Sequence, residues 1–179
     1  MNIPVVDLQD FLSGDLSKKA DFVQQLGKAY EGVGFVAVQN HGIPDDLIER
    51  LYKTVQQFFS LPLDRKKTYE MAGLAGQRGY TSFGQEHAKG SEAPDLKEFF
   101  QYGQTIEKGA VSTEVYPPNV RVDEIAGFND IFLEAYRAFE KSGKSLLEAI
   151  AIYLDLPENY FQDKVEAGNS ILRAIHYPP

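Results

Sequence analysis

The segment that most constrains the fold is a strand-like run at residues 171–177, which two prolines follow. Its apolar residues fall on both sides of the pleat, because Ile171 and Ile175 alternate with Leu172 and Ala174. A strand with two apolar faces is typical of a buried strand that has partners in a sheet. Such a strand requires partner strands, and the segments before it offer only a few. The candidates before this one are short: residues 3–8, 35–38 and 98–103.

Helical periodicity accounts for much of the remaining chain. Between residues 123 and 154, apolar residues recur at the spacing of one helix face. This pattern predicts a long amphipathic helix, or two helices that meet near Gly143. Ser17 is suited to cap a helix that ends at Gly32, and a further helix is predicted over residues 44–59. The order of strands and helices predicts an α+β fold, with a glycine-rich stretch in the middle of the chain.

Charge and composition narrow the classes of partner. The chain has a formal net charge of −8, which argues against nucleic acid or an anionic membrane as the main partner, because both select clustered Lys and Arg. Cysteine is absent, so disulfides and thiolate metal sites are excluded within this chain. No apolar run approaches the roughly 20 residues that span a bilayer, and the first residues do not read as a signal peptide. A cytoplasmic location is expected.

No local motif for catalysis or metal binding is present. The chain contains three histidines, and none has a carboxylate two residues later, as a His-x-Asp or His-x-Glu ligand pair on one strand would require. His41 reads as a hydrogen-bonded turn residue, His87 as a surface residue, and His176 as a strand residue of ambiguous direction. The sequence therefore predicts no catalytic residue and no metal ligand. The carboxylates of the middle region are expected to be solvated: Glu86, Glu92, Asp95 and Glu98.

Three residues are suited to bind a ligand that carries a carboxylate: Arg78, Arg173 and Tyr177. Arg78 lies in a glycine-rich loop, and Arg173 and Tyr177 share one face of the last strand if that strand is regular. A guanidinium and a phenol hydroxyl can both donate hydrogen bonds to carboxylate oxygens. Judged by residue type alone, a surface ion pair with one of the many acids is favoured for Arg173 over a ligand contact.

Seven segments, in order along nearly the whole chain, resemble one family. They are "IPVVDL" (3–8), "GVGFVAVQNHGIP" (32–44), "FFSLPLDRKKTY" (58–69), "RGYTSFGQE" (78–86), "DLKEFFQYG" (95–103), "LDLPENYF" (154–161) and "LRAIHYPP" (172–179). The second is the most specific. Together they resemble the isopenicillin N synthase-like superfamily of 2-oxoglutarate/Fe(II)-dependent dioxygenases, in its N-terminal region and first barrel strands only.

The resemblance implies a fold and its boundaries. An N-terminal α/β region with a long helix would lead into an incomplete double-stranded β-helix, or jelly roll. Residues 1–120 would form the N-terminal dioxygenase region. Residues 121–179 would form the long helical segment and the first core strand, with the rest of the core absent. The family's His-x-Asp pair, distal His and Arg-x-Ser would all lie beyond this chain.

The resemblance also implies roles for individual residues. His41 becomes structural, and Ile175 stands where plant relatives often have Asn, which puts a co-substrate contact at that position in doubt. No residue of this chain is implied as a catalytic group or metal ligand. The implied pocket for substrate or co-substrate is lined by Tyr177, Arg173, Arg78, Phe99 and Gln101.

The implied activity is that of an oxygenase acting on a small molecule by hydroxylation, desaturation or ring closure. Its full-length form would use Fe(II), 2-oxoglutarate and O2. This chain alone is expected to lack competence and to bind neither cofactor tightly. Two alternatives stay open: a non-catalytic binding or regulatory module derived from the family, and a member that uses no 2-oxoglutarate.

Overall fold

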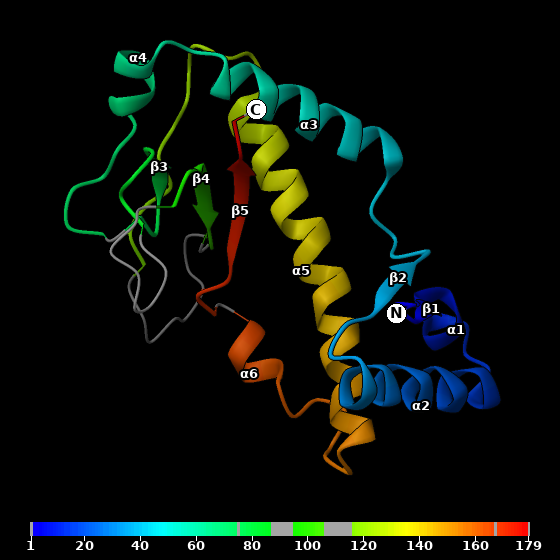
Figure 1. Ribbon diagram of the computed structural model, residues 1–179. Helices are drawn as coiled ribbons and strands as arrows, with labels where there is room; N and C mark the ends of the chain where they lie inside the picture. Colours follow the sequence, from blue (N-terminus) through cyan, green and yellow to red (C-terminus); the bar gives the residue numbers. More distant parts are fainter. Residues whose placement is uncertain (1, 75, 87–94, 106–115, 167, 179) are drawn as a thin grey trace. The chain divides into compact units, whose positions relative to one another are not determined.

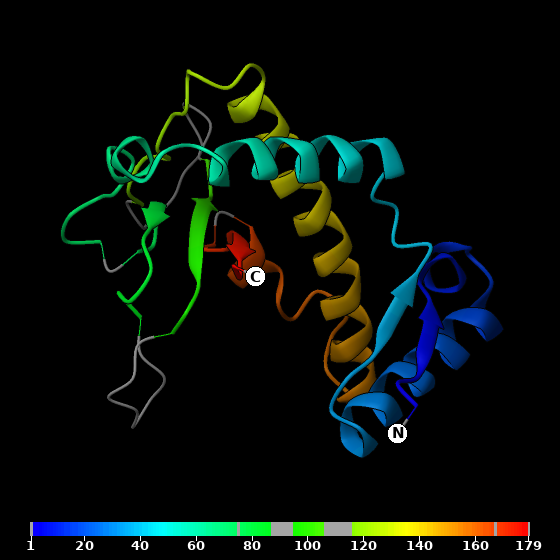
Figure 2. The ribbon, with the colours of Figure 1, turned by 45° about the horizontal axis from the view of Figure 1, so that its top comes forward.

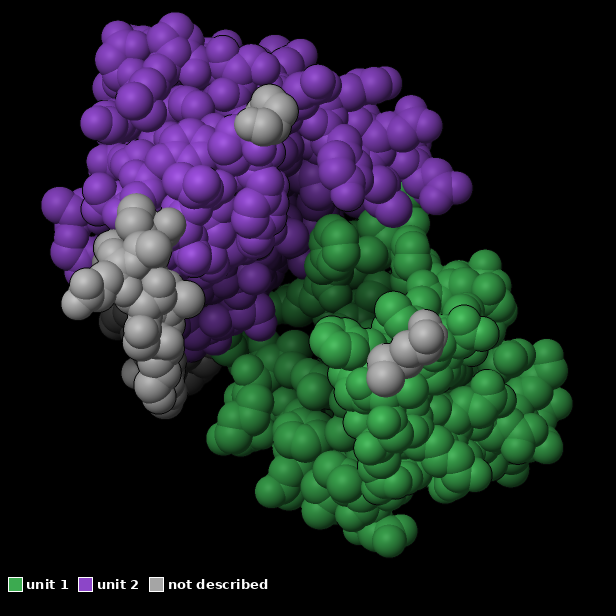
Figure 3. Space-filling view, viewed as in Figure 1, with its two compact units in different colours: residues 1–44, 137–168 green, residues 45–136, 169–179 purple. Residues whose placement is uncertain are grey.

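The structure is a computed structural model that describes residues 2–74, 76–86, 95–105, 116–166 and 168–178. By the contacts between its residues the chain divides into two compact units, which Figure 3 colours green and purple. The first unit comprises residues 1–44 and 137–168, and the second comprises residues 45–136 and 169–179. The fold mixes helices and strands, so the predicted α+β class is confirmed. No helix in the described ranges has both the length and the apolar character to cross a membrane.

In the first unit, two short parallel strands lie beside helices (Figure 2). The strands are β1 (Val5–Asp7) and β2 (Ala37–Gln39), with Val6 opposite Val38. Helices α1 (Leu8–Leu12), α2 (Leu16–Gly32) and α6 (Gln162–Val165) belong to this unit, with the later part of α5 (Phe128–Tyr153). One core of this unit is formed by residues of β1, α1, α2 and α5: Val6, Leu8, Phe11, Phe22, Val23, Leu26 and Ala149.

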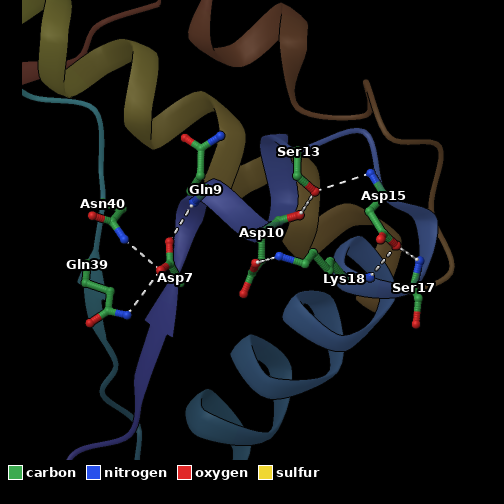
Figure 4. A network of polar contacts seen from close by, with 9 residues as sticks. All are labelled: Asp7, Gln9, Asp10, Ser13, Asp15, Ser17, Lys18, Gln39 and Asn40. Carbon is green, nitrogen blue, oxygen red and sulfur yellow. Dashed lines mark hydrogen bonds and ion pairs between the residues drawn. The ribbon is translucent and has the colours of Figure 1, made fainter.

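Two local predictions in this unit are wrong. The helix predicted to be capped by Ser17 is capped by Asp15, whose carboxylate accepts hydrogen bonds from the backbone N–H groups of Ser17 and Lys18 at 2.8 and 3.2 Å (Figure 4). A carboxylate at this position also suits the positive end of the helix dipole. The strand predicted as buried over residues 35–38 is shifted to β2, and Phe35 is 69% exposed.

The Asn-His-Gly turn after β2 is tied to β1. The side chain of Asn40 donates to Asp7 Oδ2 at 2.6 Å, and Gln39 donates to the same oxygen at 3.1 Å (Figure 4). Asn40 and Gly42 both have positive φ, which Asn and Gly adopt more readily than other residues. His41 Nδ1 accepts from the backbone N–H of Ile43, so the prediction of a hydrogen-bonded turn histidine is confirmed.

The second unit contains a three-stranded antiparallel sheet in the order β3-β4-β5 (Figure 1). The strands are β3 (Gly79–Thr81), β4 (Glu98–Gly103) and β5 (Ile171–His176). The helices are α3 (Asp45–Phe59), α4 (Leu63–Lys67) and the first part of α5, which is one continuous helix through Gly143. The last strand, which was expected to lack most of its sheet partners, has one within the chain: β4 pairs with β5 along its whole length, from Glu98 opposite His176 to Gly103 opposite Ile171.

The two faces of this sheet differ in character because side chains alternate along each strand. One face, the core face, carries Tyr80, Glu98, Phe100, Tyr102, Leu172, Ala174 and His176. Most of its apolar members belong to, or pack against, an aromatic core with Phe58, Phe59, Phe128 and Phe132. The opposite face, here called the Phe99 face, carries Thr81, Phe99, Gln101, Gly103, Arg173 and Ile175.

Candidate functional site

Predicted pocket residues from two strands meet on the Phe99 face. Phe99 lies opposite Ile175 in the sheet register, and Gln101 lies opposite Arg173. The guanidinium carbon of Arg173 is 4.3 Å from the centroid of the Phe99 ring. Stacking on an aromatic ring holds a guanidinium in a fixed plane and leaves its edge donors available. The Arg173 side chain is 36% exposed, so these donors can reach a ligand.

A carboxylate approaches Arg173 from the loop before β4. Glu86 Oε1 is 3.5 Å from Arg173 Nη1, whereas Glu86 Oε2 is 3.0 Å from Lys97 Nζ. Lys97 also pairs with Asp95 at 2.8 Å. Glu86 and Asp95 were expected to be solvated, but each is 34% exposed at its side chain and paired with Lys97. Two residues of this region, Glu92 and His87, lie outside the described residues.

Arg78 is fully buried at the end of the Phe99 face. Its guanidinium lies where a Cβ at Gly103 would be, so any side chain at Gly103 would overlap it. Nη1 donates to the carbonyl of Gln77 at 2.8 Å, whereas Nε and Nη2 have no hydrogen-bond partner among the described residues. Burial lowers the pKa of Arg78 from its ordinary value. A buried guanidinium with two unused donors is suited to bind an anion.

Of the other two predicted pocket residues, Gln101 is buried and Tyr177 is exposed. Gln101 is 3% exposed, and its side-chain amide donates to the carbonyl of Gly76, which anchors the glycine-rich loop to β4. Tyr177 follows β5 and is 66% exposed. The structure therefore brings Phe99, Gln101 and Arg173 together on one face and places Arg78 at its end. Ligand binding by these residues stays a prediction.

The core face contains a buried polar cluster that the sequence did not predict. Glu98 is 1% exposed, so its expected solvation is wrong. Its carboxylate accepts two hydrogen bonds from Lys66 Nζ, at 2.7 and 3.0 Å, and one from the hydroxyl of Tyr80. His176 Nδ1 lies 2.8 Å from Glu98 Oε1, and its ring stacks on Phe59 at 5.2 Å between centroids. A buried carboxylate with three polar partners is satisfied rather than free to act as a base.

Strand alternation is the signal that could have found this cluster. Glu98, Phe100 and Tyr102 are two residues apart on β4, so their side chains point to the same face of the sheet. A buried Phe100 therefore implies that Glu98 is buried as well. A buried carboxylate then requires a cation or donors nearby. Lys66 is 32 residues away along the chain and His176 is 78 residues away, so their identity depends on the tertiary fold.

Acid should weaken the fold through Glu98. Burial on its own raises the pKa of a carboxyl, but hydrogen bonds from Lys66, Tyr80 and His176 outweigh it and hold the Glu98 pKa below the ordinary value of 4.5. The unfolded chain therefore binds this proton more readily than the folded chain. The stabilisation is complete above pH 4.5 and is lost as the pH falls through the lower pKa of the folded state.

Urea unfolding at successive pH values measures this effect. We expect the wild-type free energy of unfolding to fall more steeply toward acid pH than that of a Glu98→Gln variant, which has no proton to gain at this position. Other paired carboxylates contribute equally to both proteins and cancel in the comparison. Parallel pH profiles for the two proteins would show that Glu98 does not have a lowered pKa.

An iron site does not fit the described residues. They contain no group of three His, Cys, Asp or Glu side chains arranged to hold a metal ion. A non-haem Fe(II) centre requires two histidines and a carboxylate around open coordination positions. His176 directs Nδ1 to Glu98, and His41 uses Nδ1 within its own turn. No step of a reaction is therefore assigned to iron within this part of the chain.

Comparison with known proteins identifies the family. The family model described as "non-haem dioxygenase in morphine synthesis N-terminal" matches residues 3–124. This match covers more than half of the chain, so the protein belongs to the non-haem dioxygenase N-terminal family. The inferred relation to the 2-oxoglutarate/Fe(II)-dependent oxygenases is confirmed by the relatives and solved structures that follow.

Among curated proteins, proline hydroxylase buaE of Petromyces alliaceus is 34% identical over 185 residues, which cover 99% of this chain and 56% of that protein. The 2-oxoglutarate-Fe(II) type oxidoreductase hxnY of Emericella nidulans is 29% identical, and 98% of this chain and 52% of that protein are covered. The chain thus spans about half the length of the curated relatives it matches.

Solved structures agree in fold. A putative 2OG-Fe(II) oxygenase family protein from Caulobacter crescentus superposes with a TM-score of 0.83 at 35% identity, over 99% of this chain and 56% of that one. A full-length Neurospora crassa protein solved in complex with alpha-KG gives a TM-score of 0.81 at 28% identity, over 98% of this chain and 54% of that one.

Proposed function

We propose that this chain forms the N-terminal half of a 2-oxoglutarate- and Fe(II)-dependent oxygenase that acts on a small molecule. The observation that carries the proposal is the alignment of 99% of the chain with 56% of the Caulobacter crescentus oxygenase, at a TM-score of 0.83. Residues 1–120 would form the N-terminal region. Residues 121–179 would supply the long helix and the first strand of the core. The reaction would be a hydroxylation, a desaturation or a ring closure.

In this proposal, the residues of the chain bind and orient the organic ligand. The guanidinium of Arg173 lies over the Phe99 ring on a side chain that is 36% exposed, and Arg78 has two buried donors without a partner among the described residues. Both are suited to hold a carboxylate of the substrate or co-substrate. Ile175 and Tyr177 would contact apolar parts of the substrate. Iron, when bound in the whole protein, supplies the oxygen chemistry.

Succinate release by the product of the complete reading frame tests the proposal. We expect succinate to form in proportion to O2 consumed, only when Fe(II) and 2-oxoglutarate are both supplied. The 179-residue chain assayed in parallel is expected to release none and to show no stoichiometric Fe(II) site by titration. Oxygen uptake by the complete protein without any use of 2-oxoglutarate would favour the alternative of a member that does not need this co-substrate.

A second candidate is a non-catalytic binding module. The observation that favours it is the lack of any three-residue metal cluster among the described residues, combined with two arginines suited to anions: Arg173 on the Phe99 face and Arg78 at its end. Such a module would bind its ligand with equal affinity in the presence and absence of Fe(II). A complete reading frame whose product binds no Fe(II) would support it over an oxygenase.

A further inference from the structure

We propose that Glu86 competes with the substrate for Arg173, and that the group it competes with is a carboxylate attached to a small apolar body. This inference rests on the proposed function, in which the Phe99 face binds the organic substrate. Glu86 would then set how strongly this face selects anionic over neutral ligands. The ligand bound at this face would be a small carboxylic acid with an apolar body.

Arg173 is only partly paired among the described residues. Its guanidinium is oriented by the Phe99 ring, at 4.3 Å from the centroid. Among the described residues, its one ion pair is the 3.5 Å contact from Nη1 to Glu86, which is longer than a well-formed charge-assisted hydrogen bond. The guanidinium of Arg173 is therefore only partly used by Glu86, and a carboxylate that accepts from two of its N–H groups would satisfy it better.

Glu86 has a second cationic partner, Lys97. Its other oxygen is 3.0 Å from Lys97 Nζ, so Glu86 keeps a cationic partner when it leaves Arg173. The backbone carbonyl of Glu86 accepts from the N–H of Asp95 at 2.9 Å, which holds the main chain in place while the side chain moves. An ion pair between partly exposed groups contributes little, so an incoming carboxylate can displace Glu86 at low cost.

Exposed apolar and aromatic side chains follow Arg173 along the chain. Ile175 is two residues from Arg173 on β5, points to the same face and is 43% exposed. Tyr177 continues this alternation and is 66% exposed. A ligand whose carboxylate meets Arg173 would therefore cover Ile175 and Tyr177 with its remaining atoms. Apolar atoms are preferred there, because burying these side chains is favourable.

Nuclear magnetic resonance titration of the 179-residue chain tests the proposal with two matched probes, benzoate and its neutral analogue benzamide. The Nε–Hε resonance of Arg173, assigned by its loss in Arg173→Lys, reports binding directly. We expect Glu86→Gln to bind benzoate about two- to five-fold more tightly than the wild type, the range that loss of a partly exposed ion pair allows. Benzamide should bind both proteins with equal affinity.

Asp95→Asn is the matched control. Asp95 pairs with Lys97, as Glu86 does, but among the described residues it forms no ion pair with Arg173. The variant therefore removes one negative charge from the same lysine without removing the contact to Arg173. We expect this variant to change the affinity for benzoate less than Glu86→Gln does. Glu86→Asp, which shortens the side chain by one methylene, should shift benzoate affinity in the same direction as Glu86→Gln and provides a second readout if Glu86→Gln folds poorly.

Three results would overturn the proposal: no benzoate-dependent shift of Arg173 in either protein, equal tightening of benzoate and benzamide by Glu86→Gln, or an equal effect of Asp95→Asn. The result is separable from the proposed function, since binding is measured without turnover. If the complete protein releases succinate but Glu86→Gln has no effect here, the inference about Glu86 fails and the oxygenase proposal stands. If no succinate forms but Glu86→Gln changes the selectivity as expected, the oxygenase proposal fails and the inference about Glu86 stands.

Discussion

A Lys66→Met variant is expected to lose about 3–5 kcal/mol of unfolding free energy, because it leaves the Glu98 carboxylate buried without its cation. Glu98 is 1% exposed at its side chain and Lys66 is 8% exposed, so water cannot replace the lost partner. Tyr80 and His176 remain as polar partners, but neither supplies the permanent positive charge of a lysine. Chemical denaturation at neutral pH measures the change.

Two further variants define the cause of this loss. Lys53→Met is the matched control, since Lys53 pairs with Glu49 on the surface with side chains 74% and 73% exposed, and its removal should change stability little. The double variant Lys66→Met/Glu98→Met should recover much of the lost stability, because it removes both charges together. A double variant as unstable as Lys66→Met would show that packing, rather than an unpaired charge, accounts for the effect.

Gly103→Ala is expected to lower the free energy of unfolding by about 1–3 kcal/mol, because its methyl group would occupy the position of the Arg78 guanidinium. The guanidinium would have to move out of a fully buried position. Arg78→Met, in contrast, removes two buried donors without partners among the described residues and should leave stability unchanged or higher. The same Arg78→Met change should abolish binding of any substrate whose carboxylate Arg78 holds.

The double variant Arg78→Ala/Gly103→Ala tests whether the overlap is the cause. A small side chain at position 78 removes the overlap, so the double variant should lose less stability than the sum of the single variants. Gly143→Ala is the matched control, because nothing lies within 4 Å of the added methyl group in α5. That change should stabilise the protein by up to about 1 kcal/mol through helix propensity. If the stability losses of Arg78→Ala and Gly103→Ala simply add in the double variant, the overlap between the Arg78 guanidinium and a side chain at position 103 is not the cause.

The helical part of the fold follows closely from the apolar spacing. The long helix predicted over residues 123–154 is observed as α5, which begins instead at Phe128. The difference has a local cause. Gly127 has a φ of 74°, and the side chain of Asn129 bonds both the N–H and the carbonyl of Val122, so the preceding residues fold back as a turn. Side-chain to backbone bonds of this kind compete with helix and are not visible in apolar periodicity.

The candidate site was less predictable than the helices. The pairing of Arg173 with Phe99 depends on the register of β4 and β5, two strands that lie far apart in sequence, at residues 98–103 and 171–176. Residue type favoured a surface ion pair for Arg173, and the structure shows two features: a guanidinium over the Phe99 ring and a long contact to Glu86. Burial of Arg78 was equally invisible, because no local pattern predicts that a charged loop residue lies over Gly103.

The order of synthesis gives the Glu98 cluster a consequence for folding. Lys66, Tyr80 and Glu98 leave the ribosome well before His176, which closes the cluster from β5. Until β5 emerges, β4 presents an unpaired edge of six residues, "EFFQYG", in which the aromatic side chains are three of the six. A nascent chain in this interval is exposed to edge-to-edge association. We therefore expect a chaperone that covers this edge until β5 has been synthesised to raise the yield of folded protein.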